Sequence, residues 1–170
     1  MAFSFLHAAD LHLDSPFRGV TAQSPEVAGP LQEATFAAFA RLVDLAIERQ
    51  VLFVLLAGDV YDGADRSLRA QLRFQAGLAR LADRGIRCLV AHGNHDSLDG
   101  WSSALQWPEQ VHVFGPEPTT VRLLQDGAAV AAVCGISYAH RRVTEPLADR
   151  LQPADSDLFQ IALLHANCGS

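Results

Sequence analysis

The sequence predicts an α/β fold of layered sheets, with two mixed β-sheets flanked by α-helices. In the first half, short continuously apolar segments alternate with longer segments whose apolar residues recur at helical spacing. This alternation favours a parallel sheet covered by helices. In the second half, shorter apolar segments follow one another closely, which is typical of a further sheet. Each apolar segment of the first half ends abruptly in polar residues.

Length and composition fit one globular domain, which we expect to span residues 1–170. Hydrophobic residues make up 49% of the chain and charged residues 19%, as in proteins with a packed core. No apolar run approaches the roughly 18 to 20 residues needed to span a bilayer, and the N-terminus lacks a basic segment. We therefore expect a cytoplasmic protein. Its three cysteines lack CxxC spacing and are expected to be core thiols.

The charges exclude several classes of chemistry. All 13 basic residues are arginines, so neither a Schiff-base lysine nor a P-loop lysine exists. The net charge of −6 has the wrong sign for holding a polyanion by a general electrostatic field. A phosphate substrate must therefore be held by bound cations or by a local arginine patch.

The first half of the chain predicts three buried strands and two helices in alternation. Strands buried on both faces read as continuous apolar runs, and the helices carry apolar residues at helical spacing. Pro30 suits the first position of one helix, and Gly85 suits the position just after the other. The predicted order is a strand at 3–9, a helix at 30–50, a strand at 51–57, a helix at 67–84 and a strand at 86–91.

The second half predicts shorter strands. They are expected at 111–114, 119–124, 128–133 and 159–164. The Asp126-Gly127 pair favours a hairpin turn between the second and third of these strands. Residues 141–151 stay ambiguous because Pro146 interrupts them.

Polar side chains with metal-binding potential follow four predicted strands. Parallel strands bring their carboxyl ends to one edge of the sheet, so these side chains should lie together. Carboxylate, imidazole and amide ligands suit Mn²⁺, Fe or Zn²⁺ rather than Ca²⁺, and the lack of a nearby cysteine favours manganese or iron. Asp59 could bridge two ions. The side chains are Asp10, His12, Asp59, Asp62, Asn94, His95 and His165.

These motifs resemble those of the calcineurin-like metallophosphoesterases in order and spacing. The resemblance rests on Asp10-x-His12, Gly58-Asp59-x-x-Asp62, GNHD at 93–96 and the apolar strand ending in His165. The segments HAADLHLDSP at 7–16 and AGDVYD at 57–62 are most similar to the SbcD-type DNA repair exonucleases. The resemblance covers essentially the whole chain.

The resemblance implies a centre of two divalent ions, with Mn²⁺ expected and Fe or Zn²⁺ as alternatives. The two ions would neutralise phosphate oxygens and generate a hydroxide for in-line attack. Asp59 would bridge them. The implied metal ligands are Asp10 and His12 for the first ion, and Asn94 and His165 for the second.

The resemblance also assigns two residues that bind no metal. His95 would approach the substrate and protonate the leaving oxygen or stabilise the pentacoordinate phosphate. Asp62 would orient the His95 imidazole.

The implied function is that of a metal-dependent phosphodiesterase acting on DNA. The resemblance also implies that the full-length protein binds an SbcC-type ATPase, and a homodimer is a further possible assembly. Two alternatives remain. One is a phosphatase or small-nucleotide phosphodiesterase of the same superfamily, and the other is a non-catalytic module that binds nucleic acid or a protein partner. The family pattern continues with a Gly-His-x-His segment, and this chain ends at Ser170. We therefore expect a domain truncated at its C-terminus. In the family pattern the two histidines of that segment complete both metal sites, so we expect the 170-residue chain by itself to be nearly inactive.

Residues beside the motifs have a structural interpretation as well as a functional one. We expect His7 and His92 to lie in the core or to support the ligands, and Asp14 and Asp96 to hold loops. One predicted helix also carries an arginine stripe that is either a track for a phosphate backbone or a solvated helix face. The stripe consists of Arg66, Arg69, Arg73, Arg80 and Arg84.

Overall fold

A computed structural model describes residues 2–16, 25–63, 67–100, 105–153 and 157–166. Four of its strands form one sheet in the order β1-β2-β3-β4, and every pair in this sheet is parallel. The strands are β1 (Phe5–Ala9), β2 (Phe53–Ala57), β3 (Arg87–Ala91) and β4 (Val111–Val113). All five residues of β2 are buried, as the continuous apolar run predicts for a central strand.

Two α-helices connect the first three strands. They are α2 (Pro25–Glu48) and α3 (Leu68–Ala82). The predicted start of the first helix at Pro30 is wrong, since α2 begins at Pro25 and contains Pro30. Pro25 fits the first helical position because no intrahelical hydrogen bond needs its missing N–H. The α3 boundaries match the prediction: the Ser67 side chain accepts from Ala70 N, and Gly85 beyond the last turn has φ +71°.

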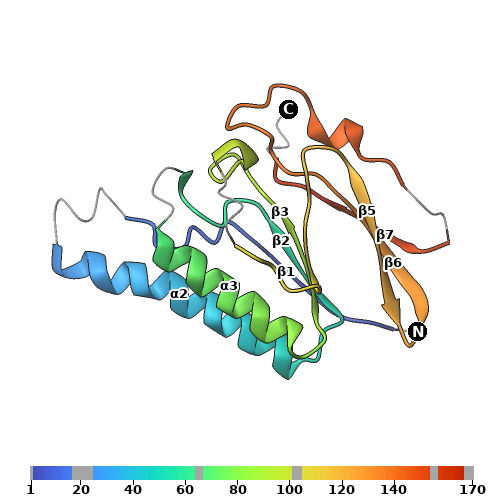
Figure 1. Cartoon of the computed structure of the whole chain (residues 1–170), viewed down its shortest axis with the longest axis horizontal. Helices are drawn as coiled ribbons and strands as arrows, with labels where there is room; N and C mark the ends of the chain where they lie inside the picture. Colours follow the sequence, from blue (N-terminus) through green and yellow to red (C-terminus); the bar gives the residue numbers. More distant parts are fainter. Residues whose placement is uncertain (1, 17–24, 64–66, 101–104, 154–156, 167–170) are drawn as a thin grey trace.

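Both helices pack on the same face of the four-stranded sheet (Figure 1). Their apolar stripes and the side chains on that face of β1, β2 and β3 form one buried cluster. Phe39 of α2 contacts Phe74 of α3 with ring centroids 5.4 Å apart. This cluster keeps both helices against the sheet.

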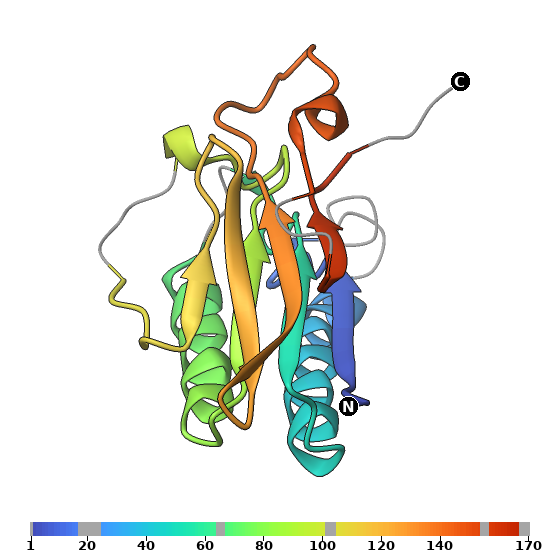
Figure 2. The ribbon, with the colours of Figure 1, turned by 90° about the vertical axis from the view of Figure 1, so that its right-hand side faces the viewer.

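A second sheet covers the other face of the first (Figures 1 and 2). It contains β5 (Thr119–Gln125), β6 (Ala128–Gly135) and β7 (Phe159–Leu163). The β5–β6 pair is antiparallel and the β6–β7 pair is parallel, so this sheet is mixed whereas the first is parallel throughout. Asp126 and Gly127 both have positive φ angles in the predicted hairpin turn. The ambiguous segment contains a 3-10 helix, η3 (Leu147–Arg150).

The predicted sandwich of two sheets with helices is therefore confirmed, but the prediction that both sheets are mixed is wrong for the first sheet, whose strands are all parallel. Apolar side chains between the sheets form a second buried cluster, which includes Phe53, Phe114 and Leu163. In the described part of the chain, no α-helix lies on the outer face of the second sheet. No helix in that part is long and apolar enough to cross a membrane. Cys88 and Cys134 are buried and unpaired, as predicted, while Cys168 lies outside the described residues.

The strand register determines where the polar motifs lie. Ala9 pairs with Ala57, and Ala57 pairs with Ala91, so β1, β2 and β3 end level with one another. These strands point upward in Figure 2, and the loops that follow them gather at the top. The segment after β7 reaches the same edge, because the His165 ring contacts the Ala57 carbonyl at the end of β2.

Candidate metal and phosphoester site

The first two loops at this edge run side by side with an unusual backbone. Asp10, His12 and Asp59 have φ angles of 54°, 42° and 52°, in the left-handed region that non-glycine residues rarely adopt. Two hydrogen bonds hold this conformation, from Asp10 N to Gly58 O (3.1 Å) and from His12 N to Asp59 O (3.0 Å). Strained residues concentrate at functional sites, where the surrounding structure enforces them. Here the strain brings three candidate ligands to one place.

Asp62 fixes the orientation of His12. His12 Nδ1 lies 2.6 Å from Asp62 Oδ1. Partial burial acts to raise the pKa of Asp62, but hydrogen bonds from Ser15 and His12 outweigh it and hold the pKa below its usual range. An ionised carboxylate only accepts, so Nδ1 carries a proton and Nε2 is the nitrogen left to face a cation. That Nε2 lies 4.0 Å from Asp10 Oδ1 and 3.9 Å from Asp59 Oδ2.

His165 approaches the same carboxylate from the other side. Its Nδ1 lies 3.2 Å from the carbonyl oxygen of Ala57, and its Nε2 lies 3.4 Å from Asp59 Oδ2. A carbonyl only accepts, so Nδ1 carries a proton and Nε2 is again the nitrogen left to face a cation. Gly58 makes this approach feasible, since a Cβ there would lie 2.4 Å from the His165 ring. One oxygen of Asp59 is therefore shared by two imidazoles.

The donor set fits a cation. Ligand atoms of Asp10, Asp59 and His165 lie within 4.8 Å of one another, as do those of His12, Asp62 and His95. Positive charge placed between each Nε2 and the carboxylate oxygen that it faces would be attracted by both atoms. Imidazole and carboxylate ligands, with each imidazole held through its other nitrogen, are the usual surroundings of a divalent transition metal. The residues present therefore fit a metal centre.

The third loop brings Asn94 and His95 to the same pocket. His95 N donates to Asp59 Oδ1 (3.0 Å), and its ring meets that of His12 edge-on at 5.5 Å. His95 Nδ1 is 3.4 Å from Asp62 Oδ1, a longer contact than the one between Asp62 and His12. Asp62 thus lies between two imidazoles, whereas the sequence paired it with His95 alone.

Asp96 connects the loop after β2 to the loop after β3. Its carboxylate is fully buried and accepts four hydrogen bonds. Oδ1 accepts from Asp59 N (3.2 Å) and Gly93 N (2.7 Å), and Oδ2 accepts from Val60 N (2.9 Å) and His92 Nδ1 (2.9 Å). Burial acts to raise the pKa of Asp96, but these hydrogen bonds, led by the one from His92, hold it below its usual range. The structure thus agrees with the expected loop-holding role of Asp96 and the supporting role of His92.

Asp14 connects the first loop to α3. Its carboxylate accepts from Ser67 Oγ and from the guanidinium of Arg69, and its backbone N donates to Thr35 Oγ1 (3.1 Å). Burial acts to raise the pKa of Asp14, but the Arg69 and Ser67 hydrogen bonds outweigh it and lower the pKa. Asp14 therefore holds its loop, as the structural interpretation expects.

The arginine stripe faces acidic side chains. Arg69 pairs with Glu33 (2.6 Å), Arg73 with Glu33 (3.3 Å) and Arg80 with Asp44 (2.7 Å). Arg69 and Arg73 also lie over the ring of Phe36, at 4.9 and 4.6 Å from its centroid. Interhelical ion pairs thus account for three members of the stripe, which favours the helix-surface interpretation. Arg66 lies outside the described residues.

The ligand cluster opens into a pocket of about 580 Å³. Its charged lining consists of carboxylates and histidines, and no arginine lines it within the described chain. Two lining residues, His7 and Tyr138, were not singled out as site residues from the sequence. His7 is exposed, so the expected core role is wrong for it. Its place at the start of the segment HAADLHLDSP was the available signal, whereas Tyr138 follows a strand without a carboxylate nearby.

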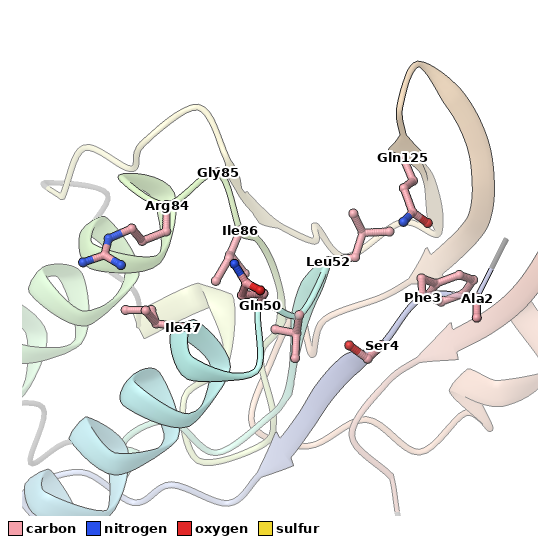
Figure 3. Close-up of a pocket in the computed structure, with 11 residues that line it drawn as sticks. Ala2, Phe3, Ser4, Ile47, Gln50, Leu52, Arg84, Gly85, Ile86 and Gln125 are labelled. Atoms are coloured by element: carbon pink, nitrogen blue, oxygen red, sulfur yellow. The ribbon is translucent and has the colours of Figure 1, made fainter.

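A second pocket, of about 420 Å³, lies at the opposite edge of the parallel sheet (Figure 3). It is lined by the residues that precede β1, β2 and β3, together with Gln125 from the hairpin. Arg84 and Gln125 lie on opposite sides of it, as Figure 3 shows. Among the described residues, its lining contains no histidine, cysteine or carboxylate. Of these two pockets, the first is therefore the one that contains candidate metal ligands.

Comparison of the sequence with known proteins gives several relatives. A Bacillus subtilis protein named "Uncharacterized metallophosphoesterase YhaO" is 40% identical over 95% of this chain and 40% of its own length. The SbcD subunit of the B. subtilis SbcCD nuclease is 31% identical over 85% of this chain and 36% of its own length. The "DNA double-strand break repair protein Mre11" of Sulfurisphaera tokodaii is 29% identical over 94% of this chain and 40% of its own length.

This chain thus spans about 40% of the length of these relatives. The sequence profile of one family, described as calcineurin-like phosphoesterase, matches residues 3–163 and so includes every strand of both sheets. The chain belongs to the calcineurin-like phosphoesterase family.

Proposed function

We propose that this chain is the phosphoesterase part of a metal-dependent nuclease that hydrolyses DNA phosphodiester bonds. The main observation that supports this proposal is the environment of Asp59 Oδ2, which faces the Nε2 atoms of His12 and His165 at 3.9 and 3.4 Å next to a pocket. A carboxylate shared by two imidazoles is the expected arrangement for a two-metal phosphoesterase. The pocket offers no arginine to a phosphate among its described residues, so bound cations must supply the positive charge.

In this proposal Asp59 serves both ions. Asp10 and His12 would complete one site, and Asn94 and His165 the other, with Mn²⁺ as the expected ion. Both sites would offer oxygen and nitrogen ligands without sulfur, which suits manganese. When bound, the ions supply electrostatic stabilisation of the phosphate and lower the pKa of a water molecule.

The chain's own residues then have distinct tasks. Asp62 holds the His12 ring so that Nε2 faces the carboxylates. His95 is held beside Asp59 by its backbone hydrogen bond, and its imidazole donates a proton to the leaving oxygen. The remote hydrogen bonds of Asp96 keep these loops in register before substrate binds, which limits reorganisation during the reaction.

The DNA substrate is inferred from the relatives, two of which are named as part of a nuclease and as a DNA double-strand break repair protein. Association of the full-length protein with an SbcC-type ATPase, or with a second copy of itself, belongs to the same proposal.

The test uses the full-length protein and compares hydrolysis of linear DNA with that of p-nitrophenyl phosphate, a phosphomonoester, at millimolar Mn²⁺. We expect DNA cleavage that EDTA abolishes and that exceeds monoester hydrolysis by a wide margin. Asp59→Asn should lower cleavage by about 10² or more, because both ions depend on this carboxylate. Asp44→Asn is the matched control, since Asp44 pairs with Arg80 on the helical face. Monoester hydrolysis without DNA cleavage, or equal activities of the two variants, would contradict the proposal.

A further inference from the structure

Tyr138 occupies a fixed position next to the third loop. It follows β6 closely, and its N donates to the carbonyl oxygen of His92 (3.1 Å). Its own carbonyl oxygen accepts from Leu98 N (3.0 Å). The preceding Ser137 is buried, and its hydroxyl donates to Phe114 O (2.6 Å) and accepts from His92 N (2.9 Å). The backbone of Tyr138 is therefore tied to the loop that carries Asn94 and His95.

Tyr138 lines the pocket and does not belong to the hydrophobic core. Its ring lines the pocket and meets the His165 ring edge-on, with centroids 6.1 Å apart and planes at 71°. The ring is partly exposed and belongs to neither buried apolar cluster. Its hydroxyl makes no hydrogen bond within the described part of the protein. Apart from imidazoles, it is the one aromatic ring lining the pocket there.

The lining of the pocket combines charged and apolar residues. Asp10, Asp59 and the imidazoles suit cations and a phosphate. The end of β7 and the following residues contribute apolar lining, together with Tyr138. The apolar residues there are Ala162, Leu163, Leu164 and Ala166. A volume of about 580 Å³ lies in the range of roughly 300–1,000 Å³ typical of small-molecule sites, which leaves room for a nucleotide.

We propose that Tyr138 is a substrate-binding residue that stacks on the nucleobase next to the phosphate undergoing hydrolysis. This inference rests on the proposed function and names the part of the substrate that the pocket recognises. A flat base suits an aromatic residue that lines the pocket and is held beside the His165 imidazole. Stacking accepts any base, because every base has a π-face. The loss of one stacking residue should lower affinity by about tenfold or more.

The experiment compares two phosphodiesters with the same leaving group, using the full chain with Mn²⁺. Thymidine 5′-(p-nitrophenyl phosphate) contains a nucleoside, whereas methyl p-nitrophenyl phosphate contains none. Tyr138→Ala should lower kcat/KM for the thymidine ester about tenfold, mainly through KM, and leave the methyl ester within about twofold. Tyr138→Phe, which keeps the ring, should behave as the unmodified chain does with both esters.

A binding measurement separates this inference from the proposed function. We expect Tyr138→Ala to weaken binding of thymidine 5′-monophosphate to the Mn²⁺-loaded chain about tenfold and to leave methyl phosphate unchanged. Failure of the unmodified chain to hydrolyse either ester would contradict the proposed function, and the binding data alone would then decide the role of Tyr138. Equal effects of Tyr138→Ala on both ligands, or an equal loss in Tyr138→Phe, would overturn the stacking role.

Discussion

Replacement of Asp96 by asparagine tests whether the buried carboxylate holds the site together. Each carboxylate oxygen accepts two hydrogen bonds, and an asparagine amide offers a single oxygen. In either orientation of the amide, two donors therefore face an NH₂ group. Hydrogen bonds to a charged group contribute about 1.5–3 kcal/mol each, so the loss of two costs about 3–6 kcal/mol. For a chain of this size, the Tm should fall by roughly 6–24 °C.

Thermal unfolding followed by circular dichroism measures this cost, with Asp99→Asn as the matched control. Asp99 lies three residues away and also binds a hydroxyl and an imidazole, at Ser97 (2.8 Å) and His140 (3.3 Å), but it is exposed. We expect the control to leave the Tm almost unchanged. An equally small effect of Asp96→Asn would refute the view that this carboxylate organises the two loops.

The loss of unfolding free energy in Asp96→Asn should also depend on pH. The folded-state pKa of Asp96 lies below its unfolded value, so its contribution is fully present above the ordinary aspartate pKa. It is lost as the pH falls through the folded-state pKa. The gap in unfolding free energy between the unmodified chain and Asp96→Asn should therefore be constant from about pH 6 to 8 and narrow in acid. A gap that widens in acid would contradict this assignment.

Three further predictions concern the site and the core. Gly58→Ala should weaken Mn²⁺ binding, measured by calorimetry, because the new Cβ would displace the His165 ring. The control is Gly85→Ala, which should leave binding unchanged, since Gly85 has a similar φ of +71° but open space around it. Equal Mn²⁺ affinities of the two variants would exclude the close approach of His165. His95→Asn should lower kcat by about 10² while KM and Mn²⁺ stoichiometry stay the same, and a lost ion would instead make His95 a ligand. Burial raises the pKa of the Cys88 thiol to about 12. Iodoacetamide at about pH 8 should therefore label Cys88 only as fast as the chain unfolds. Labelling that is fast in the native protein and insensitive to denaturant would disprove the burial of Cys88.

Much of this arrangement could be predicted from the sequence because it depends on local patterns. The apolar runs before Asp10, Asp59 and His165 predict where the strands lie, and the parallel register then brings their ends to one edge. The prediction that the first strand is buried is wrong, because β1 is a partly exposed strand at the edge of its sheet, whereas β2 is central and buried. The Asp-Gly turn and the position of Gly85 just beyond α3 follow from residue chemistry. The start of α2 could not be predicted, because Pro25 and Pro30 both satisfy the rule for a first helical position.

Features that depend on packing between distant segments were out of reach. The pairing of Arg69 with Glu33 requires the relative placement of α2 and α3, which no pattern within either helix encodes. The link from Asp62 to His12 spans 50 residues and depends on left-handed φ angles in two loops. Tyr138 reaches the pocket because its backbone pairs with the third loop, and only the tertiary structure contains that contact.

Anomalous diffraction at the manganese edge tests directly whether two metal ions share Asp59. Crystals of this chain soaked in millimolar MnCl₂ should show two peaks roughly 3.5–4 Å apart, both next to the Asp59 carboxylate, with His12 beside one and His165 beside the other. Crystals of Asp59→Asn should lose both peaks. Manganese bound elsewhere with none in this pocket, or two peaks that persist in Asp59→Asn, would contradict the account.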